Sequence, residues 1–156
     1  MAMPPTIDLT GKVALVTGGT RGLGRNIAAR LQQAGCTVAV CGRNAPSELS
    51  AGISFYKADI READQAKALV ESVVAETGRL DFLINNAGGS PASDAATASP
   101  RFVEAILKLN LVGPLYMAQA AYPHLKAAGG GSIINIASVS GARPSPGTAI
   151  YGAAKA

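Results

Sequence analysis

The stretch KVALVTGGTRGLG, residues 12–24, decides the fold. Its first part, Lys12–Thr17, is a short apolar run rich in valine, which is typical of a buried strand. The glycines that follow predict a tight turn that leads directly into a helix. That helix has one apolar face and can end at Gly35; the face consists of Leu23, Ile27, Leu31 and Ala34.

Strands and helices alternate along the rest of the chain. Further strands are predicted at Thr37–Cys41, Ile53–Ala58, Leu80–Ile84 and Ser132–Ala137. A helix ending at Gly78 is marked by Ala66, Leu69, Val70, Val73 and Thr77. A long helix is predicted from Pro100, with Ser99 as its N-cap, to about Ala128. The segment Asn44–Gly52 is so short that its crossover helix is expected to be stunted.

This alternation predicts an α/β fold with a parallel sheet and helices on both faces. The Rossmann-type doubly wound version has the strand order 3-2-1-4-5-6. The chain ends at Ala156, after the fifth predicted strand, so we expect the order 3-2-1-4-5 with the later strands missing. Residues 1–156 are thus predicted to form a single, incomplete dinucleotide-binding domain.

Composition excludes several classes of protein. Of the 156 residues, 48% are hydrophobic and 15% are charged, with a net charge of +4, so the chain can form a core and is not a disordered tail. No apolar run approaches the ~18 residues that a membrane-spanning helix needs. Met1–Thr10 lacks the pattern of a secretory signal. We therefore expect a soluble, cytoplasmic protein.

Nucleic-acid binding, a disulfide and a metal site are not expected either. The basic residues are scattered, and aromatic residues make up only 4% of the chain, too few for stacking on bases. Cys36 and Cys41 lie five positions apart, which places them on opposite faces of a strand. His124 is the only histidine, and it cannot complete a metal site with those cysteines.

The glycine turn has the spacing GxxxGxG, formed by Gly18, Gly22 and Gly24. The usual GxGxxG dinucleotide fingerprint does not fit, because Ile27 stands where its third glycine would be, and no Gly-Lys-Ser/Thr of a P-loop follows. Even so, a glycine turn lets backbone N–H groups approach a pyrophosphate, which the positive end of the next helix attracts. The alternative is a tight turn that merely requires glycine.

Two arginines favour NADP(H) over NAD(H). An NAD site places an acidic residue about 20 positions after the glycines, against the ribose hydroxyls. Here Arg43 stands 19 positions after Gly24, with no carboxylate beside it, and Arg21 lies in the turn itself. Guanidinium groups suit a 2′-phosphate. The alternative is that either arginine is simply solvated.

Asp59, at the end of the third predicted strand, has two interpretations that both remain open. Its carboxylate can accept a hydrogen bond from an adenine amino group. Glu62, three residues later, also makes the pair resemble a helix capping box.

Taken together, the glycine turn, Asn85-Asn86-Ala87-Gly88 and Tyr151-x-x-x-Lys155 resemble the short-chain dehydrogenase/reductase family. The resemblance runs from about Leu9 to the end of the chain and includes Ser138 and Asn110. Members similar to 3-oxoacyl carrier-protein reductases fit the NADP preference. The resemblance implies a cofactor site that consists of Gly18, Thr20, Arg21, Gly22, Leu23, Gly24, Arg43, Asp59, Ile60, Asn86, Ala87, Gly88, Tyr151 and Lys155.

The implied reaction is hydride transfer between NADP(H) and a ketone or secondary alcohol, with Tyr151 as acid/base. Reduction of a ketone needs a proton on the developing alkoxide. A phenol has an ordinary pKa of ~10, and an ammonium one helical turn away favours its ionised form, which Lys155 can provide. In the family this lysine also holds the nicotinamide ribose, and Ser138 orients the substrate oxygen.

Asn110 is the fourth implied catalytic residue. Pro114 has no N–H to donate to the Asn110 carbonyl, so we expect a kink over Asn110–Pro114. In the family the freed carbonyl holds a water in a proton relay with Lys155; the alternative is an ordinary kink that faces solvent. Residues 139–150 are expected to form one wall of the substrate pocket, stiffened by Arg143, Pro144 and Pro146.

The missing strands lead to two alternatives. A full-length protein is expected to be an active reductase and a homo-oligomer that acts on a small molecule. Residues 1–156 alone are expected to bind NADP(H) weakly with little or no turnover, because the fifth strand is left as an apolar edge and few residues follow Tyr151. The alternative is a truncated, inactive NADP-binding or interaction fragment.

Overall fold

The computed structural model describes residues 7–143 and 145–156. Its strands are β1 (Val13–Thr17), β2 (Thr37–Gly42), β3 (Ile53–Lys57), β4 (Phe82–Asn85) and β5 (Ser132–Asn135). Its helices are α1 (Gly22–Gln33), α2 (Ala63–Thr77), α3 (Pro100–Leu107), the π-helical segment η1 (Lys108–Val112), α4 (Gly113–Ala127), α5 (Val139–Ala142) and α6 (Ala149–Lys155). None of these helices is long and apolar enough to cross a membrane.

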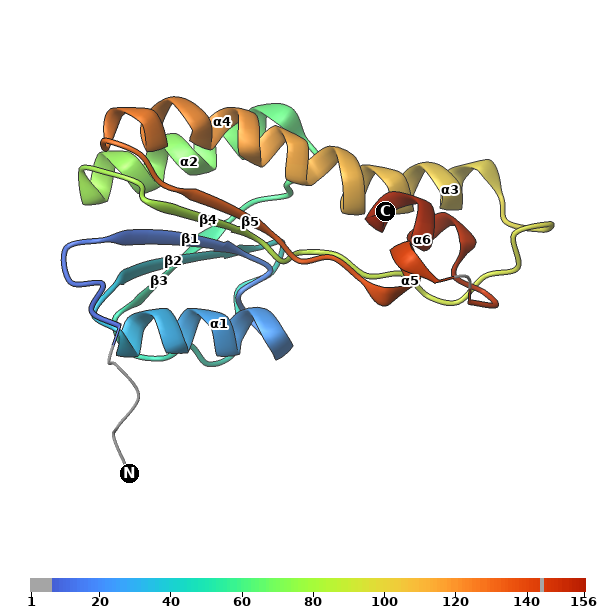
Figure 1. The fold of residues 1–156 in the computed structure, drawn as a ribbon, viewed down its shortest axis with the longest axis horizontal. Helices are drawn as coiled ribbons and strands as arrows, with labels where there is room; N and C mark the ends of the chain where they lie inside the picture. Colours follow the sequence, from blue (N-terminus) through green and yellow to red (C-terminus); the bar gives the residue numbers. More distant parts are fainter. Residues whose placement is uncertain (1–6, 144) are drawn as a thin grey trace.

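All strand pairs of the sheet are parallel, and the strand order is β3-β2-β1-β4-β5. Helix α1 lies on one face, whereas α2 and α4 lie on the other (Figure 1). The predicted α/β, Rossmann-type doubly wound sheet is therefore confirmed, including the strand order.

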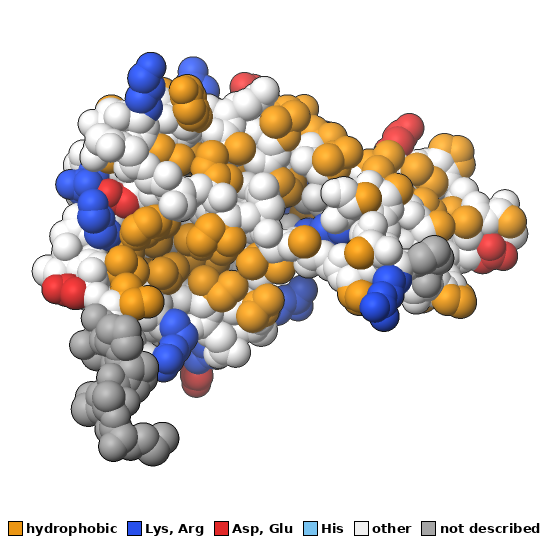
Figure 2. All heavy atoms as spheres, viewed as in Figure 1, with side chains coloured by type: hydrophobic (Ala, Val, Ile, Leu, Met, Phe, Trp, Pro, Cys, Tyr) orange, Lys and Arg blue, Asp and Glu red, His pale blue; other side chains and the backbone are white. Residues whose placement is uncertain are grey.

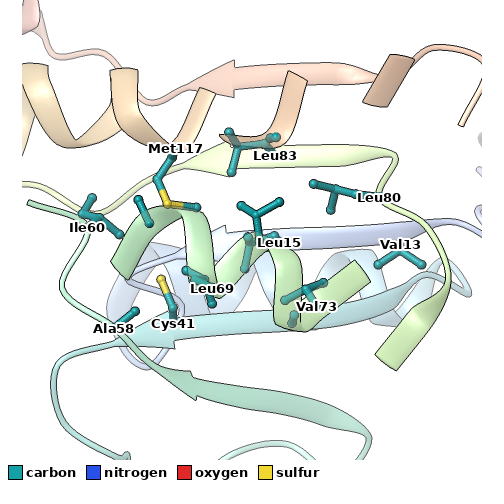
Figure 3. Close-up of a cluster of buried hydrophobic side chains, with 14 of the residues drawn as sticks. Val13, Leu15, Cys41, Ala58, Ile60, Leu69, Val73, Leu80, Leu83 and Met117 are labelled. Atoms are coloured by element: carbon teal, nitrogen blue, oxygen red, sulfur yellow. The ribbon is translucent and has the colours of Figure 1, made fainter. Parts of the chain in front are cut away.

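The core lies on both sides of β1, because successive side chains of a strand point to opposite faces. Val13 and Leu15 belong to the cluster under α2 and α4, whereas Ala14 and Val16 pack toward α1. In the first cluster, Leu15, Leu83 and Met117 join β1, β4 and α4 (Figure 3). The valine-rich run is thus apolar throughout because both of its faces are buried.

Two local predictions differ from the structure, and one helix was not predicted. The helix expected from Pro100 to Ala128 is divided into α3, η1 and α4, although Ser99 does cap it by accepting a hydrogen bond from the Phe102 N–H. No helix forms between β2 and β3. The short helix α5 was not predicted, because four residues show no periodicity.

Helices α3, α5 and α6 gather beyond the carboxyl ends of the strands (Figure 1). Parallel α/β sheets bind ligands at this end, where the loops after each strand converge. Every predicted catalytic residue lies on η1, α5 or α6, or immediately before one of them. The fold thus places them at the end of the sheet where a ligand is expected.

Strand β5 forms an apolar edge, as predicted. All four of its residues are exposed, including Ile133 at 37% and Ile134 at 49%. Ile134 is paired with the buried Ile84 and so shares the face that α1 covers farther along the sheet. Hydrophobic side chains gather over this side of the molecule (Figure 2).

Cys36 and Cys41 are both buried and unpaired with each other. Cys36 packs in the cluster on the α1 face and Cys41 in the cluster under α2 and α4, which confirms the predicted opposite faces. Burial raises the pKa of Cys36 to about 11 and that of Cys41 to about 12. Both thiols are therefore protonated near neutral pH.

At the opposite end of the sheet, Asp81 ties β1 to β4. Its buried carboxylate accepts hydrogen bonds from the Val13 N–H at 3.0 Å, from Lys12 Nζ at 3.1 Å and from two nitrogens of Arg79 at 2.6 and 2.8 Å. Burial by itself would raise the pKa of Asp81, but these hydrogen bonds outweigh it and lower the pKa to about 2.

This network predicts a loss of stability in acid. Because the folded-state pKa of Asp81 lies below its ordinary value of 3.8, its contribution is present above pH ~4 and is lost as the pH falls through about 2. We expect that contribution to be ~1–2 kcal/mol, since Lys12 and Arg79 are partly exposed.

Urea unfolding between pH 6 and pH 2 checks it, with Asp81→Asn compared with the wild type and with the exposed control Glu104→Gln. The difference between wild type and Asp81→Asn should shrink toward pH 2. A difference that does not vary with pH would contradict the role of the Asp81 charge.

Candidate active site

The turn between β1 and α1 brings backbone segments closer together than side chains would allow. Gly18 and Gly22 have φ angles of +63° and +54°, which favour glycine. A Cβ atom at Gly24 would lie 2.5 Å from the Gly18 carbonyl oxygen. The first N–H groups of α1 have no helical acceptor. The glycine turn and the start of α1 therefore form a cradle without side chains, which fits an anionic pyrophosphate.

Asn86, just after β4, holds the glycine turn. Its side-chain Nδ2 donates to the carbonyl oxygens of Thr17 at 2.9 Å and Gly18 at 3.2 Å. The backbone N–H groups of Asn86 and Ala87 both donate to Thr17 Oγ1 at 3.0 Å. The segment after β4 and the glycine turn therefore form one connected surface.

The predicted 2′-phosphate residues lie at the surface. Arg21 is the N-cap of α1, and Arg43 follows β2 directly. Both are exposed, and neither forms an ion pair with any residue in the described part of the chain. Two unpaired guanidinium groups flanking the carboxyl end of the sheet are available to an anion.

The capping-box interpretation of Asp59 is wrong. The N-cap of α2 is Glu62, whose carboxylate forms an ion pair with Lys108 at 2.8 Å. Asp59 instead accepts hydrogen bonds from Arg61, from its N–H at 3.1 Å and its Nε at 2.9 Å. These bonds lower the pKa of Asp59, and the charge of Arg43 makes a smaller contribution in the same direction.

The helix is irregular near Asn110, where the π-helical segment η1 spans Lys108–Val112, whereas the kink expected over Asn110–Pro114 stays a prediction. Pro114 cannot donate to the Asn110 carbonyl, and a wider turn accommodates the missing bond. The buried Asn110 side chain bonds to Gly89 in both directions: Oδ1 accepts from the Gly89 N–H at 2.8 Å, and Nδ2 donates to its carbonyl at 3.0 Å. Nδ2 also donates to the Ile106 carbonyl at 2.9 Å, so the side chain is fully engaged.

Lys155 reaches the same place from α6. A Cβ atom added at Gly88 would lie 3.2 Å from Lys155 Nζ and 2.7 Å from Asn110 Oδ1, so both side chains converge on Gly88. Lys155 Nζ donates to the Ile136 carbonyl at 2.9 Å. Burial lowers the pKa of Lys155, because charge is disfavoured away from water.

Tyr151 and Ser138 lie on neighbouring short helices. Tyr151 is half-buried on α6, one turn before Lys155, and Ser138 is the N-cap of α5, where its Oγ accepts from the Ser140 N–H at 3.2 Å. The helices pack closely: a Cβ at Gly152 would lie 2.5 Å from the Ser140 carbonyl oxygen. The glycine thus brings the helix of Tyr151 against the one that begins at Ser138.

The remaining predicted cofactor residues differ in exposure. The side chain of Thr20 lies near Gly42, at the end of β2, and Leu23 is exposed at the start of α1. Ile60 is buried in the cluster under α4, so only its backbone is available to a ligand.

The prediction that residues 139–150 form a wall of the substrate pocket stays a prediction. Pro144 lies outside the described residues. The Ser93 N–H donates to the Gly147 carbonyl at 3.0 Å, so the loop after β4 meets the loop between α5 and α6. A hollow of about 420 Å³ lined by Arg143 and Thr148 is bordered by Gly152 and Ala153 but not by Tyr151 or Lys155, so it lies on the far side of α6.

Sequence reasoning missed three groups at this site: the Arg61 guanidinium, the Ile136 carbonyl and the Asn85 amide. Arg61 could have been found from its place two residues after Asp59. The Ile136 carbonyl leaves no signal in the sequence, because any residue has one. No group of three or more His, Cys, Asp or Glu side chains able to hold a metal occurs in residues 7–143 and 145–156.

Comparison with known proteins agrees with this geometry. A family model described as short chain dehydrogenase matches residues 12–156. A tropinone reductase homolog from Arabidopsis thaliana is 39% identical over 95% of this chain and 60% of its own length. A 3-oxoacyl-acyl-carrier-protein reductase, FabG, from Staphylococcus aureus is 36% identical over 93% of this chain and 63% of its own length. The chain therefore spans about 60% of these relatives.

A solved structure shares the fold as well. A short-chain dehydrogenase from Streptomyces avermitilis superposes with a TM-score of 0.85 at 29% identity, over 92% of this chain and 55% of that one. By sequence and by structure, the chain belongs to the short-chain dehydrogenase/reductase family.

Proposed function

We propose that the protein carrying this chain reduces a ketone, or oxidises the corresponding secondary alcohol, with NADP(H). The observation that carries the proposal is the unbroken run of contacts from the glycine turn through Asn86 and Gly88 to Asn110 and Lys155. Because the turn at Gly18 and Gly24 has room for a pyrophosphate, this run of contacts supports the proposal that Lys155 meets the nicotinamide end of a bound dinucleotide.

The dinucleotide, when bound, supplies or accepts the hydride. The first-turn N–H groups of α1 bind its phosphates, Arg21 and Arg43 bind the 2′-phosphate, and Asp59 accepts from the adenine amino group. Ser138 orients the substrate oxygen, and Tyr151 donates the proton that the alkoxide needs. The Lys155 ammonium stabilises the phenolate and binds the nicotinamide ribose. The Asn110 carbonyl holds a water that relays protons to Lys155.

The test measures the loss of NADPH absorbance with a panel of ketones. It uses a protein of the relatives' length that contains this chain, beside residues 1–156 alone. We expect turnover in the longer protein, and weak NADPH binding with little or no turnover in residues 1–156, because β5 and its apolar side chains are exposed. Saturable NADPH binding without turnover in the longer protein would favour a binding or interaction protein instead.

The same longer protein is proposed to be a homo-oligomer in the cytoplasm. Helix α4 and the segment before it carry an exposed apolar row along one side, formed by Leu111, Leu115 and Tyr122. Their spacing of four and seven residues keeps them on one helical face, which a second copy can cover.

Arg43 provides the test of cofactor preference. Arg43→Ala is expected to weaken NADPH binding ~10–100-fold, since a charged hydrogen-bond partner contributes ~1.5–3 kcal/mol, and to leave NADH binding nearly unchanged. Fluorescence titration with both cofactors checks it. The control is Arg30→Ala, an exposed arginine whose side chain donates to Gln33 Oε1 at 3.2 Å. Equal losses for NADPH and NADH would contradict a 2′-phosphate contact.

A further inference from the structure

Asn85, the last residue of β4, is a buried amide with one unsatisfied atom. Only 2% of the residue is exposed. Its Nδ2 donates to the Pro114 carbonyl at 3.2 Å and to Asn135 Oδ1 at 2.9 Å. Its own Oδ1 has no hydrogen-bond partner among the residues that the structure describes. Two donated hydrogen bonds are therefore what this asparagine supplies, and the unsatisfied oxygen is their cost.

The bond to Pro114 forms one half of a clamp. The segment 85–89 begins with the last residue of β4, and the segment 110–114 runs from η1 into α4. Asn85 binds Pro114 at one end, and Gly89 binds the Asn110 side chain at the other. The two contacts therefore join the same two segments and hold them side by side. On each segment, the residues that form the contacts lie four positions apart.

Two of the side chains proposed to act in the reaction, Asn110 and Lys155, meet at the clamp. Gly88 lies within it, against Asn110 Oδ1 and Lys155 Nζ. On the other side, a Cβ at Gly113 would lie 3.1 Å from Ile60 Cδ1, so the segment 110–114 already rests against the turn that leads into α2. A shift of Pro114 must therefore move the Asn110 backbone, its freed carbonyl included, relative to Gly88.

We propose that Asn85 is a positioning residue that acts through the Pro114 carbonyl. It sets the orientation of η1 and so fixes the Asn110 carbonyl and the place where Lys155 meets Gly88. This proposal rests on the proposed reductase function. Asn86, by contrast, holds the glycine turn, so the loss of Asn85 should affect the chemical step and leave cofactor binding largely intact.

The first test substitutes the amide in the full-length protein. Asn85→Leu removes the donor, and we expect kcat to fall about tenfold or more with the KM for NADPH changed less than about twofold. The matched control is Asn135→Ser, which removes the other partner of Asn85 and leaves the bond to Pro114 in place; we expect its kcat within about twofold of the wild type.

The second test measures how kcat depends on pH. A purely structural role of Asn85 would not change this dependence. Asn85→Asp loses the donor when its carboxyl is ionised and regains it when protonated. Relative to the wild type, its kcat should rise as the pH is lowered, whereas the ratio for Asn85→Leu should stay constant. A ratio for Asn85→Asp that does not change with pH, with an ordinary melting temperature, would overturn the proposal.

Amide exchange separates this proposal from the proposed function. The Gly89 N–H donates to Asn110, so its hydrogen exchange should speed up about tenfold or more in Asn85→Leu and not in Asn135→Ser. If the wild type reduces no ketone, the reductase proposal fails whatever the exchange shows. Unchanged exchange and unchanged kcat in Asn85→Leu, in an active wild type, would refute the clamp alone.

Discussion

Replacement of Tyr151 by phenylalanine is expected to lower kcat for ketone reduction by ~1000-fold or more, since proton transfer by a positioned acid contributes ~100–10,000-fold. Only the hydroxyl oxygen is removed, so the packing of α6 against α5 is retained. Apart from Lys155, which keeps its place on α6, the groups proposed to bind NADPH lie chiefly on other elements, from the glycine turn to the segment after β4. We therefore expect the dissociation constant of NADPH to change less than about threefold.

Single-turnover absorbance at 340 nm and NADPH fluorescence titration measure the two quantities separately. The matched control is Tyr122→Phe, the same change at an exposed tyrosine of α4. It should keep the activity of the wild type. An active Tyr151→Phe protein would show that the proton comes from another group and would remove the central assignment of the site.

The second large effect is expected from Gly24→Ala. In an open helix this change favours folding, because alanine has a higher helix propensity than glycine by ~1 kcal/mol. Here the new Cβ would overlap the Gly18 carbonyl and the Asn86 amide nitrogen, neither of which can move without breaking the link to β4. We expect NADPH affinity to fall ~100-fold and the free energy of unfolding to fall by ~2 kcal/mol.

Isothermal titration with NADPH and urea unfolding check this result. Asn26→Ala, an exposed position on the same helix, serves as the control and should change neither quantity appreciably. If Gly24→Ala bound NADPH like the wild type, the close approach of α1 to the turn would not be what forms the cradle.

The fold could be predicted because its signals are local. The run Lys12–Thr17 is apolar on both faces, and such a strand followed by a glycine turn and a helix of period 3.6 has few alternatives. The αL residue Gly78 and the N-cap Ser99 also end and begin their helices as local chemistry requires. Apart from the division of the long helix, the absent helix between β2 and β3 and the unpredicted α5, the differences are at element ends: β4 begins two residues later than predicted, at Phe82.

The contacts within the site could be predicted less well from the sequence, because they depend on tertiary packing. Asn110 could be placed near a disruption because Pro114 follows it, but the form of that disruption depends on where the helix meets Ile60 and Asn85. Asp59 was ambiguous because the choice between Glu62 and Arg61 as its partner depends on Lys108, which lies 46 residues from Glu62 along the chain. Contacts of this kind come from tertiary packing and leave no periodic pattern.

The burial of Cys36 and Cys41 has a practical consequence for experiments on this protein. A thiol that stays protonated and shielded reacts slowly with alkylating reagents and peroxide, so the native chain should tolerate handling in air without forming mixed adducts. Because Cys36 and Cys41 report on opposite sides of the sheet, the rate at which each is labelled reveals which layer of the molecule opens first.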